Sequence, residues 1–331
     1  MPPDHGIDRV LDRLVVPGYT KVGLAVRRHS SMPADPPPGT MRDKRVIVTG
    51  AGGGIGEAGA KSLARLGATV HMLGRSRERL EPAAGRIERE LRESGLSPDL
   101  ELEECDVSDL ENVREFAVRF GARASAADSA LDAVVHNAGV LPAQREVSRD
   151  GHELTVATHV LGPVLMTELL RPQLARSAWP PRVVFVASGG MYLQPLRLDD
   201  LEYTGGPYRG ATAYARSKRM QVELAEPLSE RWAADGIHVY AMHPGWVDTA
   251  GITAALPGFS KLMRPLLRSA EDGADTIVWL TSARPAPESG RFWHDRSERP
   301  TSYLARTKPA AGETAALAQW VFEAISARGC A

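Results

Sequence analysis

Tyr214 and Lys218 are the pair of residues whose types and spacing most directly indicate chemistry. They lie about one helical turn apart in the run Ala213-Tyr-Ala-Arg-Ser-Lys218, so a helix would place a phenol and an ammonium on the same face. A free tyrosine titrates at about pH 10, and a neighbouring cation lowers the pKa of a phenol by direct electrostatics. We therefore predict that Tyr214 exchanges a proton with a substrate oxygen, while Lys218 favours the phenolate and reaches cofactor ribose hydroxyls.

A glycine-rich turn precedes this pair at Thr49-Gly-Ala-Gly-Gly-Gly-Ile-Gly56. It closes a β-branched run and opens a helical pattern, so backbone N–H groups can approach a pyrophosphate without Cβ clashes. A purely structural turn would show the same glycines, but together with Tyr214 and Lys218 the turn predicts dinucleotide-dependent carbonyl or alcohol chemistry. The candidate cofactor ligands in it are Gly50, Gly52, Gly54, Ile55 and Gly56.

The end of the second β-branched run indicates which cofactor binds. NAD sites usually carry a carboxylate there, which bonds the ribose 2′-hydroxyl, whereas this chain has Gly74 followed by Arg75. A guanidinium suits a 2′-phosphate by charge and forked geometry. We therefore predict NADP(H) in preference to NAD(H), the alternative being that Arg75 only begins a solvated helix.

Later strand ends carry further candidates, because ligands bind at the carboxyl ends of strands in open α/β sheets. Ser188 is predicted to hold the substrate carbonyl oxygen as a hydroxyl donor. An acidic side chain at Asp106 could bond the adenine amino group, and the small residues after Asn137 would leave room for the nicotinamide-side ribose. These candidate cofactor residues are Asp106, Val107, Asn137, Ala138 and Gly139.

Strand and helix patterns alternate along the chain, which implies parallel pairing with right-handed crossovers. The β-branched runs occupy 45–49, 68–73, 100–105, 133–136, 182–187 and 237–242, and helical patterns occupy about 56–66, 76–94, 109–123, 151–174, 213–234, 271–282 and 313–327. We predict an α/β fold, a single Rossmann-type domain with a doubly wound parallel sheet and helices on both faces. Its expected parts are an N-terminal extension with a Pro-rich linker (1–42), the NADP-binding catalytic domain (43–295) and a C-terminal extension with a closing helix (296–331).

The amino-acid composition limits which partners and which cellular location we expect. The 331 residues include 40 basic and 41 acidic ones, so no overall field favours nucleic acid, and none is expected as a partner. Cys105 and Cys330 give neither metal-ligand spacing nor a disulfide framework. No apolar run reaches the roughly 18 to 20 residues that span a bilayer, and a secretory signal pattern is missing. We therefore expect a cytoplasmic protein.

The N-terminal segment 1–32 carries a short amphipathic pattern. We favour an arm packed on its own domain, and peripheral membrane contact is the alternative. Residues 250–268 carry a second amphipathic pattern, which predicts a lid over an apolar substrate, a dimer surface or ordinary core.

These motifs, in this order, resemble the short-chain dehydrogenase/reductase family over about residues 43–295. The matching segments are the turn at 49–56, Asn137-Ala-Gly139, Ser188, Tyr214 with Lys218, and Pro244-Gly245. The long 188–214 segment and Arg75 are similar to its retinol-dehydrogenase-like branch. Segments 188–191, 242–246, 248–249, 257–259 and 289–292 resemble the member-twelve type of dehydrogenase/reductase within that branch.

The resemblance implies roles for particular residues. Tyr214 would be the acid/base, Lys218 its electrostatic partner and ribose ligand, and Ser188 the carbonyl holder. A segment with four further cofactor residues would cover the nicotinamide, namely Pro244, Gly245, Val247 and Thr249. Homo-oligomers are usual in the family, so a homo-oligomer is expected.

Two positions depart from the family pattern. His136 replaces the first asparagine of Asn-Asn-Ala-Gly, which is a mild change. His159, in Thr158-His-Val-Leu-Gly162, replaces an asparagine that helps hold a water in a proton relay. An imidazole could do the same with different geometry, or His159 could be a core or ribose-facing residue with no catalytic part.

The predicted function is therefore NADP(H)-dependent interconversion of a small-molecule ketone or aldehyde with the corresponding alcohol by hydride transfer, with lipophilic compounds among the candidate substrates. The alternative is a regulatory or scaffold protein that binds NADP(H) with little turnover.

Overall fold

A single eight-stranded sheet organises the chain in the computed structural model, which describes residues 8, 10–12, 15–248 and 263–327. The strand order is β3-β2-β1-β4-β5-β6-β7-β8, with parallel pairing throughout except between β7 and β8. The strands are β1 (Arg45–Thr49), β2 (Thr69–Gly74), β3 (Asp99–Glu104), β4 (Ala133–His136), β5 (Arg182–Val186), β6 (His238–Met242), β7 (Arg291–His294) and β8 (Ser297–Glu298). The predicted doubly wound α/β fold is confirmed.

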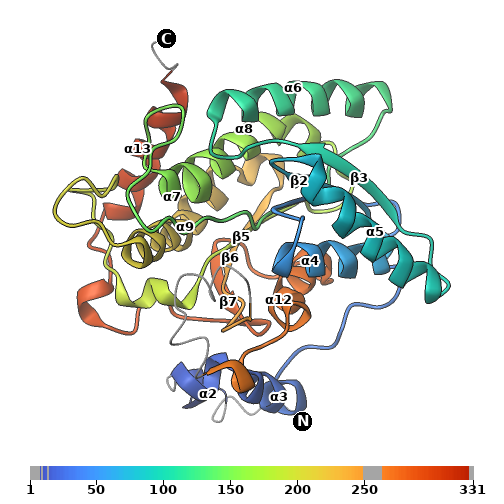
Figure 1. The fold of residues 1–331 in the computed structure, drawn as a ribbon, viewed down its shortest axis with the longest axis horizontal. Coiled ribbons are helices and arrows are strands. Elements are labelled where there is room, and N and C mark those ends of the chain that lie inside the picture. Colours follow the sequence, from blue (N-terminus) through green and yellow to red (C-terminus); the bar gives the residue numbers. More distant parts are fainter. Residues whose placement is uncertain (1–7, 9, 13–14, 249–262, 328–331) are drawn as a thin grey trace.

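Helices cover both faces of the sheet (Figure 1). One face packs against α4 (Gly54–Arg65), α5 (Arg77–Glu93) and α12 (Ala270–Ser282), and the other against α6 (Leu110–Ala126), α8 (Gly162–Leu174) and α9 (Gly210–Arg231). The closing helix α13 (Glu313–Ser326) packs beside α9 and adds Leu317, Val321 and Ile325 to the second core. Central strands are buried on both faces, which explains their continuous apolar runs.

Local capping sets where two of these helices begin. The Asp109 side chain accepts a hydrogen bond from the backbone N–H of Asn112 at the start of α6, and Ser269 with Asp272 forms a capping box at the start of α12. None of the helices in the described part of the chain is both long and apolar enough to cross a membrane.

The chain before the sheet forms α2 (Val15–Tyr19) and α3 (Lys21–Ser30), which lie beside α12 and the loops at the carboxyl ends of β6 and β7 (Figure 1). Arg28 of α3 pairs with Asp272 and Asp275 of α12. The arm therefore packs on its own chain, as the favoured interpretation predicted.

The sequence patterns missed some elements. Neither β7 nor β8 was predicted, because four and two residues are too short to show a period. The helix expected at 151–174 begins instead with α7 (Leu154–Val156), passes through a π-helical turn (Ala157–Leu161) and continues as α8. Short helical turns also lie at Gly189–Leu193, Ala233–Asp235, Arg264–Leu266 and Ala305–Thr307. Because β8 continues the sheet beyond position 295, the C-terminal extension contributes to the fold itself.

Candidate active site

The glycine-rich turn has the geometry that a dinucleotide phosphate needs. Gly50 and Gly54 have φ of +67° and +56°, a region that side-chain-bearing residues rarely adopt. A Cβ at Gly56 would lie 2.3 Å from the carbonyl oxygen of Gly50, whereas a Cβ at Gly53 would meet nothing within 4 Å. The turn is therefore tightly folded on the inside and open on the outside, at the N-terminus of α4, where backbone N–H groups can receive a pyrophosphate. Gly52 and Ile55 belong to the same turn, with the Gly52 Cα beside the backbone of Arg79.

Asn137 ties the next strand end to this turn. Its side-chain amide donates to the carbonyl oxygen of Thr49 at 3.0 Å, and the backbone N–H groups of Asn137 and Ala138 both donate to the Thr49 hydroxyl. A Cβ on Gly139 would lie 3.2 Å from His159 Nε2. These bonds hold the loop after β4 against the loop after β1, as sheet adjacency requires.

Asp106 and Val107 follow β3, as predicted. The Asp106 carboxylate accepts hydrogen bonds from the backbone N–H and hydroxyl of Ser108, at 2.9 and 2.7 Å. Val107 lies against α8, where a Cβ on Gly162 would come 1.8 Å from the Val107 carbonyl oxygen. The Asp106 side chain thus stabilises its own loop, and the Val107 carbonyl packs against α8.

Arg75 is exposed just past the end of β2. Within the described residues it has no ion-pair partner within 4 Å, whereas nearby Arg77 pairs with Glu81 on α5. A guanidinium left unpaired at the expected 2′-position is compatible with a phosphate ligand.

Tyr214 and Ser188 come together from α9 and from the end of β5. Burial raises the pKa of Tyr214 to about 12, and the neighbouring Ser188 side chain offsets part of that rise. Lys218 lies one turn further along α9 with Nζ 5.5 Å from the centroid of the Tyr214 ring. The pKa of Tyr214 is therefore raised rather than lowered, contrary to the prediction from the sequence, because burial of the phenol is the largest cause.

Lys218 is fully buried and directs its ammonium at neutral oxygens. Nζ donates to the carbonyl oxygen of Val186 at 2.7 Å and to Gln221 Oε1 at 3.1 Å. Burial lowers the pKa of Lys218 to about 7, since withdrawing an ammonium from water disfavours its charged form.

His159 occupies the π-helical turn before α8, a feature that recurs at functional sites. Its Nε2 accepts a hydrogen bond from the backbone N–H of Val140 at 3.0 Å, so Nδ1 carries the proton and donates to the Ser217 hydroxyl at 2.7 Å. Burial, reinforced by the nearby Lys218, holds the pKa of His159 well below its usual range. The ring stands edge-on to Tyr214 at 5.4 Å. His159 is thus a neutral residue whose two nitrogens both hold other parts of the site.

Two residues near Tyr214 were missed by sequence reasoning. The Ser217 hydroxyl donates to the carbonyl oxygen of Tyr214 at 2.8 Å while accepting from His159. The Gln221 amide donates to the carbonyl oxygen of His159 at 2.7 Å while its oxygen accepts from Lys218. Gln221 follows Lys218 by nearly one helical turn, and that spacing was the available signal.

The loop after β6 carries Pro244, Gly245 and Val247. Gly245 has φ of +79°, and a Cβ there would lie 2.5 Å from Arg268 Nε. Arg268 donates to the carbonyl oxygen of Pro244 at 3.2 Å, and its backbone pairs with that of Val247. This loop lies beside the one carrying Ser188, because β5 and β6 are neighbours. The predicted cofactor residue Thr249 and most of the proposed lid at 250–268 lie outside the described residues.

Comparisons with known proteins agree with this arrangement. Residues 44–257 match the short chain dehydrogenase family. Human dehydrogenase/reductase SDR family member 12 is 40% identical over 254 residues, which cover 76% of each chain. Human retinol dehydrogenase 14 is 34% identical over 281 residues, 79% of this chain and 81% of the relative.

A solved structure gives the same fold. A short chain dehydrogenase from Escherichia coli CFT073, complexed with NADPH, is 25% identical with a TM-score of 0.61, and the match covers 79% of this chain and 100% of the other. The family resemblance found in the motifs, including its retinol-dehydrogenase-like relatives, is confirmed. The chain therefore belongs to the short-chain dehydrogenase family, and it is an oxidoreductase that uses a nicotinamide cofactor on small-molecule substrates.

Proposed function

We propose that this oxidoreductase interconverts a ketone or aldehyde with the corresponding alcohol, with NADP(H) as cofactor and Tyr214 as acid/base. The observation that carries the proposal is that the side chains of Tyr214 and Ser188 meet, closely enough for Ser188 to lower the pKa of the Tyr214 phenol against the effect of burial. Ser188 lies in the loop that follows β5, and the phosphate-compatible glycine turn follows β1 at the same edge of the sheet. Two hydroxyls at one point can bind one carbonyl oxygen from two directions.

The protonation states favour carbonyl reduction in the neutral pH range. A phenol with a pKa of about 12 is protonated at neutral pH, so Tyr214 is ready to give a proton to the carbonyl oxygen. Ser188 would hold that oxygen by donating its hydroxyl hydrogen. The bound nicotinamide would supply the hydride to the carbonyl carbon in this direction and accept it in the other. Lys218 would then face the phenolate left on Tyr214.

The test is to replace Tyr214 by Phe and measure NADPH oxidation with a panel of ketones and aldehydes. Loss of the proton donor is expected to lower kcat by about 10² to 10⁴, with NADPH affinity retained. Tyr240→Phe is a matched control, because this buried hydroxyl donates only to the carbonyl oxygen of Pro287, away from the site. Unchanged turnover in Tyr214→Phe would remove the acid/base assignment.

The preference for NADP(H) is supported by Arg75 and by NADPH in the E. coli relative. Arg75→Ala is expected to weaken NADPH binding by about tenfold, which corresponds to about 1.4 kcal/mol, and to leave NADH binding unchanged. Arg92→Ala, at the far end of α5, is the control. Equal losses for the two cofactors in Arg75→Ala would show that the guanidinium does not read the 2′-phosphate.

A second candidate function is NADP(H) binding with little turnover. It is favoured by the ammonium of Lys218, whose hydrogen bonds go to Val186 and Gln221. Tight NADPH binding without turnover across a broad carbonyl panel would support it. Cytoplasmic location and homo-oligomer formation stay proposals, which cell fractionation and light scattering can test.

A further inference from the structure

The loop after β6, residues 243–248, begins beside the Ser188 segment and ends beside the glycine turn. At its far end, Val247 and Ile55 of the turn pack against the same point of α12. A Cβ on Gly273 of that helix would lie 2.6 Å from Val247 Cγ2 and 3.2 Å from Ile55 Cγ1. The loop therefore adjoins the site that is shaped for a pyrophosphate.

The near end of the loop lies beside Gly189, the residue that follows Ser188. A Cβ on Gly189 would come 3.6 Å from His243 Nδ1 and 3.0 Å from Tyr19 Cε2. The rings of Tyr19 and His243 are themselves in edge contact, with centroids 4.6 Å apart. A dinucleotide whose phosphates occupy the glycine turn and whose nicotinamide reaches Ser188 and Tyr214 would lie along this loop.

One fully buried residue, Arg268, holds the loop. Its backbone N–H donates to the carbonyl oxygen of Trp246 at 2.8 Å, and its carbonyl oxygen accepts from the backbone N–H of Asp248 at 3.0 Å. Its guanidinium donates to the carbonyl oxygen of Pro244 at 3.2 Å. Nε lies so close to Gly245 that a Cβ there would come within 2.5 Å of it. The backbone conformation of the loop therefore depends on Arg268.

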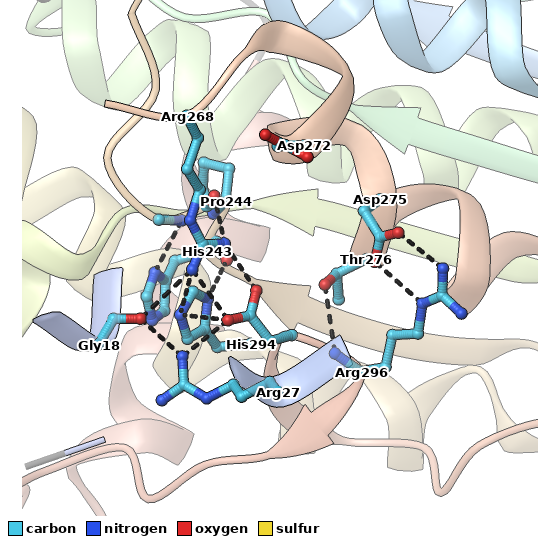
Figure 2. Close-up of polar contacts among 12 residues, drawn as sticks. Gly18, Arg27, His243, Pro244, Arg268, Asp272, Asp275, Thr276, His294 and Arg296 are labelled. Carbon is cyan, nitrogen blue, oxygen red and sulfur yellow. Dashed lines mark hydrogen bonds and ion pairs between the residues drawn. The ribbon is translucent and has the colours of Figure 1, made fainter. Parts of the chain in front are cut away.

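The N-terminal arm, which contains α2 and α3, supplies further partners of the same guanidinium. Arg268 donates to the carbonyl oxygens of Gly18 and Thr20, each at 3.3 Å, and Figure 2 shows the contact with Gly18. Between these two residues, the carbonyl oxygen of Tyr19 accepts a hydrogen bond from the backbone N–H of Trp246 at 2.8 Å. Three successive carbonyl groups of the arm thus bind the loop or the arginine that holds it.

Arg27 of α3 fixes the part of the arm that offers these carbonyl groups. Its guanidinium donates to the carbonyl oxygen of Gly18 at 2.6 Å, to Asp8 at 2.8 Å and to Asp295 at 2.7 Å. Asp295 also binds Arg268 through both of its oxygens, at 2.6 and 2.9 Å. Such deeply buried pairs stay together, because separation would leave unpaired charges out of water. Within the described residues Arg27 makes no hydrogen bond to the loop after β6, so it acts on the loop through these partners.

We propose that the N-terminal arm, through Arg268, holds the loop after β6 in the shape that receives the nicotinamide half of the cofactor. Arg268 is then a positioning residue, and the arm is a working part of the cofactor site. A loop that is ordered in advance spares the cofactor the entropic cost of ordering it. The inference rests on the proposed NADP(H) chemistry for the place of the nicotinamide.

A comparison of NADPH with 2′,5′-ADP isolates the nicotinamide half, because 2′,5′-ADP carries the adenosine and two phosphates without the nicotinamide. Calorimetry measures Kd for both ligands in Arg268→Met, which loosens the loop directly, and in Arg27→Met, which loosens the arm. Arg182→Met is the matched control. Arg182 is equally buried and also donates to backbone carbonyl oxygens, those of Leu280 and Ala283, but it lies at the amino end of β5.

We expect Arg268→Met and Arg27→Met each to weaken NADPH binding by about tenfold or more and to leave 2′,5′-ADP binding close to that of the parent protein. In Arg182→Met the ratio of the two Kd values should match the parent. Equal losses for the two ligands in the first two variants would indicate general destabilisation and would overturn the proposal. A parent-like ratio in Arg27→Met would also overturn it, because the arm would then have no part in cofactor binding.

Hydrogen exchange of the parent protein tests the same link without a substitution that could impair folding. Two elements that favour each other's ordered state do so reciprocally, so a bound nicotinamide should in turn protect the arm. NADPH should slow amide exchange in α2 and α3 several-fold, whereas 2′,5′-ADP should slow it in the glycine turn and leave the arm unchanged. Exchange in α2 and α3 that responds to neither ligand, or equally to both, would overturn the proposal. Both NADPH responses in a protein that reduces no carbonyl compound would support the role of the arm and refute the proposed reaction instead.

Discussion

Two buried polar clusters in this molecule respond to burial in opposite ways. The first cluster, which we propose to be catalytic and call the catalytic cluster, comprises His159, Tyr214, Ser217, Lys218 and Gln221. The anchor cluster holds the arm and comprises Asp8, Asp12, Arg27, Arg268, Asp295 and Arg299 (Figure 2 shows part of it). Both lie at the carboxyl edge of the sheet, so their difference comes from their chemistry.

The anchor cluster balances each cation against a carboxylate. Arg268 and Arg27 both bind Asp295, and these cations, with His294, hold the pKa of Asp295 far below its usual range despite burial. In the catalytic cluster, the described residues place no carboxylate within 4 Å of Lys218 Nζ, whose partners are neutral oxygens. Its pKa falls to about 7. The charges that meet at Asp295 are therefore locked in their ionised forms, although burial raises the pKa of Asp12 at the edge of the same cluster. The lone buried cation of Lys218 is instead left ready to change its protonation state.

Removing one carboxylate from the anchor cluster gives the largest expected effect. Asp295→Asn leaves Arg268 and Arg27 buried without their shared partner, which is expected to lower the free energy of unfolding by about 3 to 5 kcal/mol. Urea unfolding at pH 7 measures it. Asp199→Asn breaks an exposed pair with Arg197 and should leave the unfolding midpoint unchanged. A loss in Asp295→Asn no larger than that control would show that the cluster does not hold the arm.

The lone cation predicts a pH dependence of stability. The pKa of Lys218 is about 7 in the folded chain and about 10.4 in the unfolded one. Between these values the unfolded chain binds one more proton, so the free energy of unfolding should rise with pH by about 1.4 kcal/mol per pH unit. Below pH 7 both states are protonated and the slope disappears.

Lys218→Met removes this slope, and urea unfolding of the cofactor-free proteins from pH 6 to 9 measures the difference between them. The buried thiol of Cys105, whose pKa is raised to about 12, contributes equally to both proteins and cancels. If the free energy of unfolding depended on pH in the same way in Lys218→Met and in the parent, the pKa of Lys218 would not be lowered in the folded chain. The difference between the two clusters in their response to burial would then be refuted.

The two clusters also differ in how far the sequence predicts them. Tyr214, Lys218, Ser188 and the glycine turn are found from local patterns, because a helix period or a strand end places each residue. Gln221 could have been found from its spacing on the same helix. The raised pKa of Tyr214 could not, because it depends on how much water the surrounding fold excludes.

No local sequence pattern predicts the anchor cluster. Arg27 and Asp295 are 268 positions apart, and each alone is an ordinary charged residue in a polar stretch. Burial of so many charges follows only from where β7 and the arm meet, and β7 itself was too short to predict. The topology of the main sheet can be predicted from the alternating strand and helix patterns of the sequence. The contacts between the two ends of the chain are visible only in the structure.

The smallest expected effect concerns Gln221, which bridges Lys218 to the backbone of His159. Gln221→Leu removes the bridge and leaves a buried ammonium with one partner and a buried carbonyl without its amide donor. If Gln221 positions Lys218, kcat should fall by about tenfold, or about 1.4 kcal/mol, with KM for NADPH little changed. The pH at which kcat changes should move as well, which a purely structural loss would not cause.

His159→Asn keeps the backbone carbonyl that Gln221 reaches, so its kcat should fall less. A larger fall in kcat for His159→Asn than for Gln221→Leu would instead assign the proton relay to the His159 imidazole.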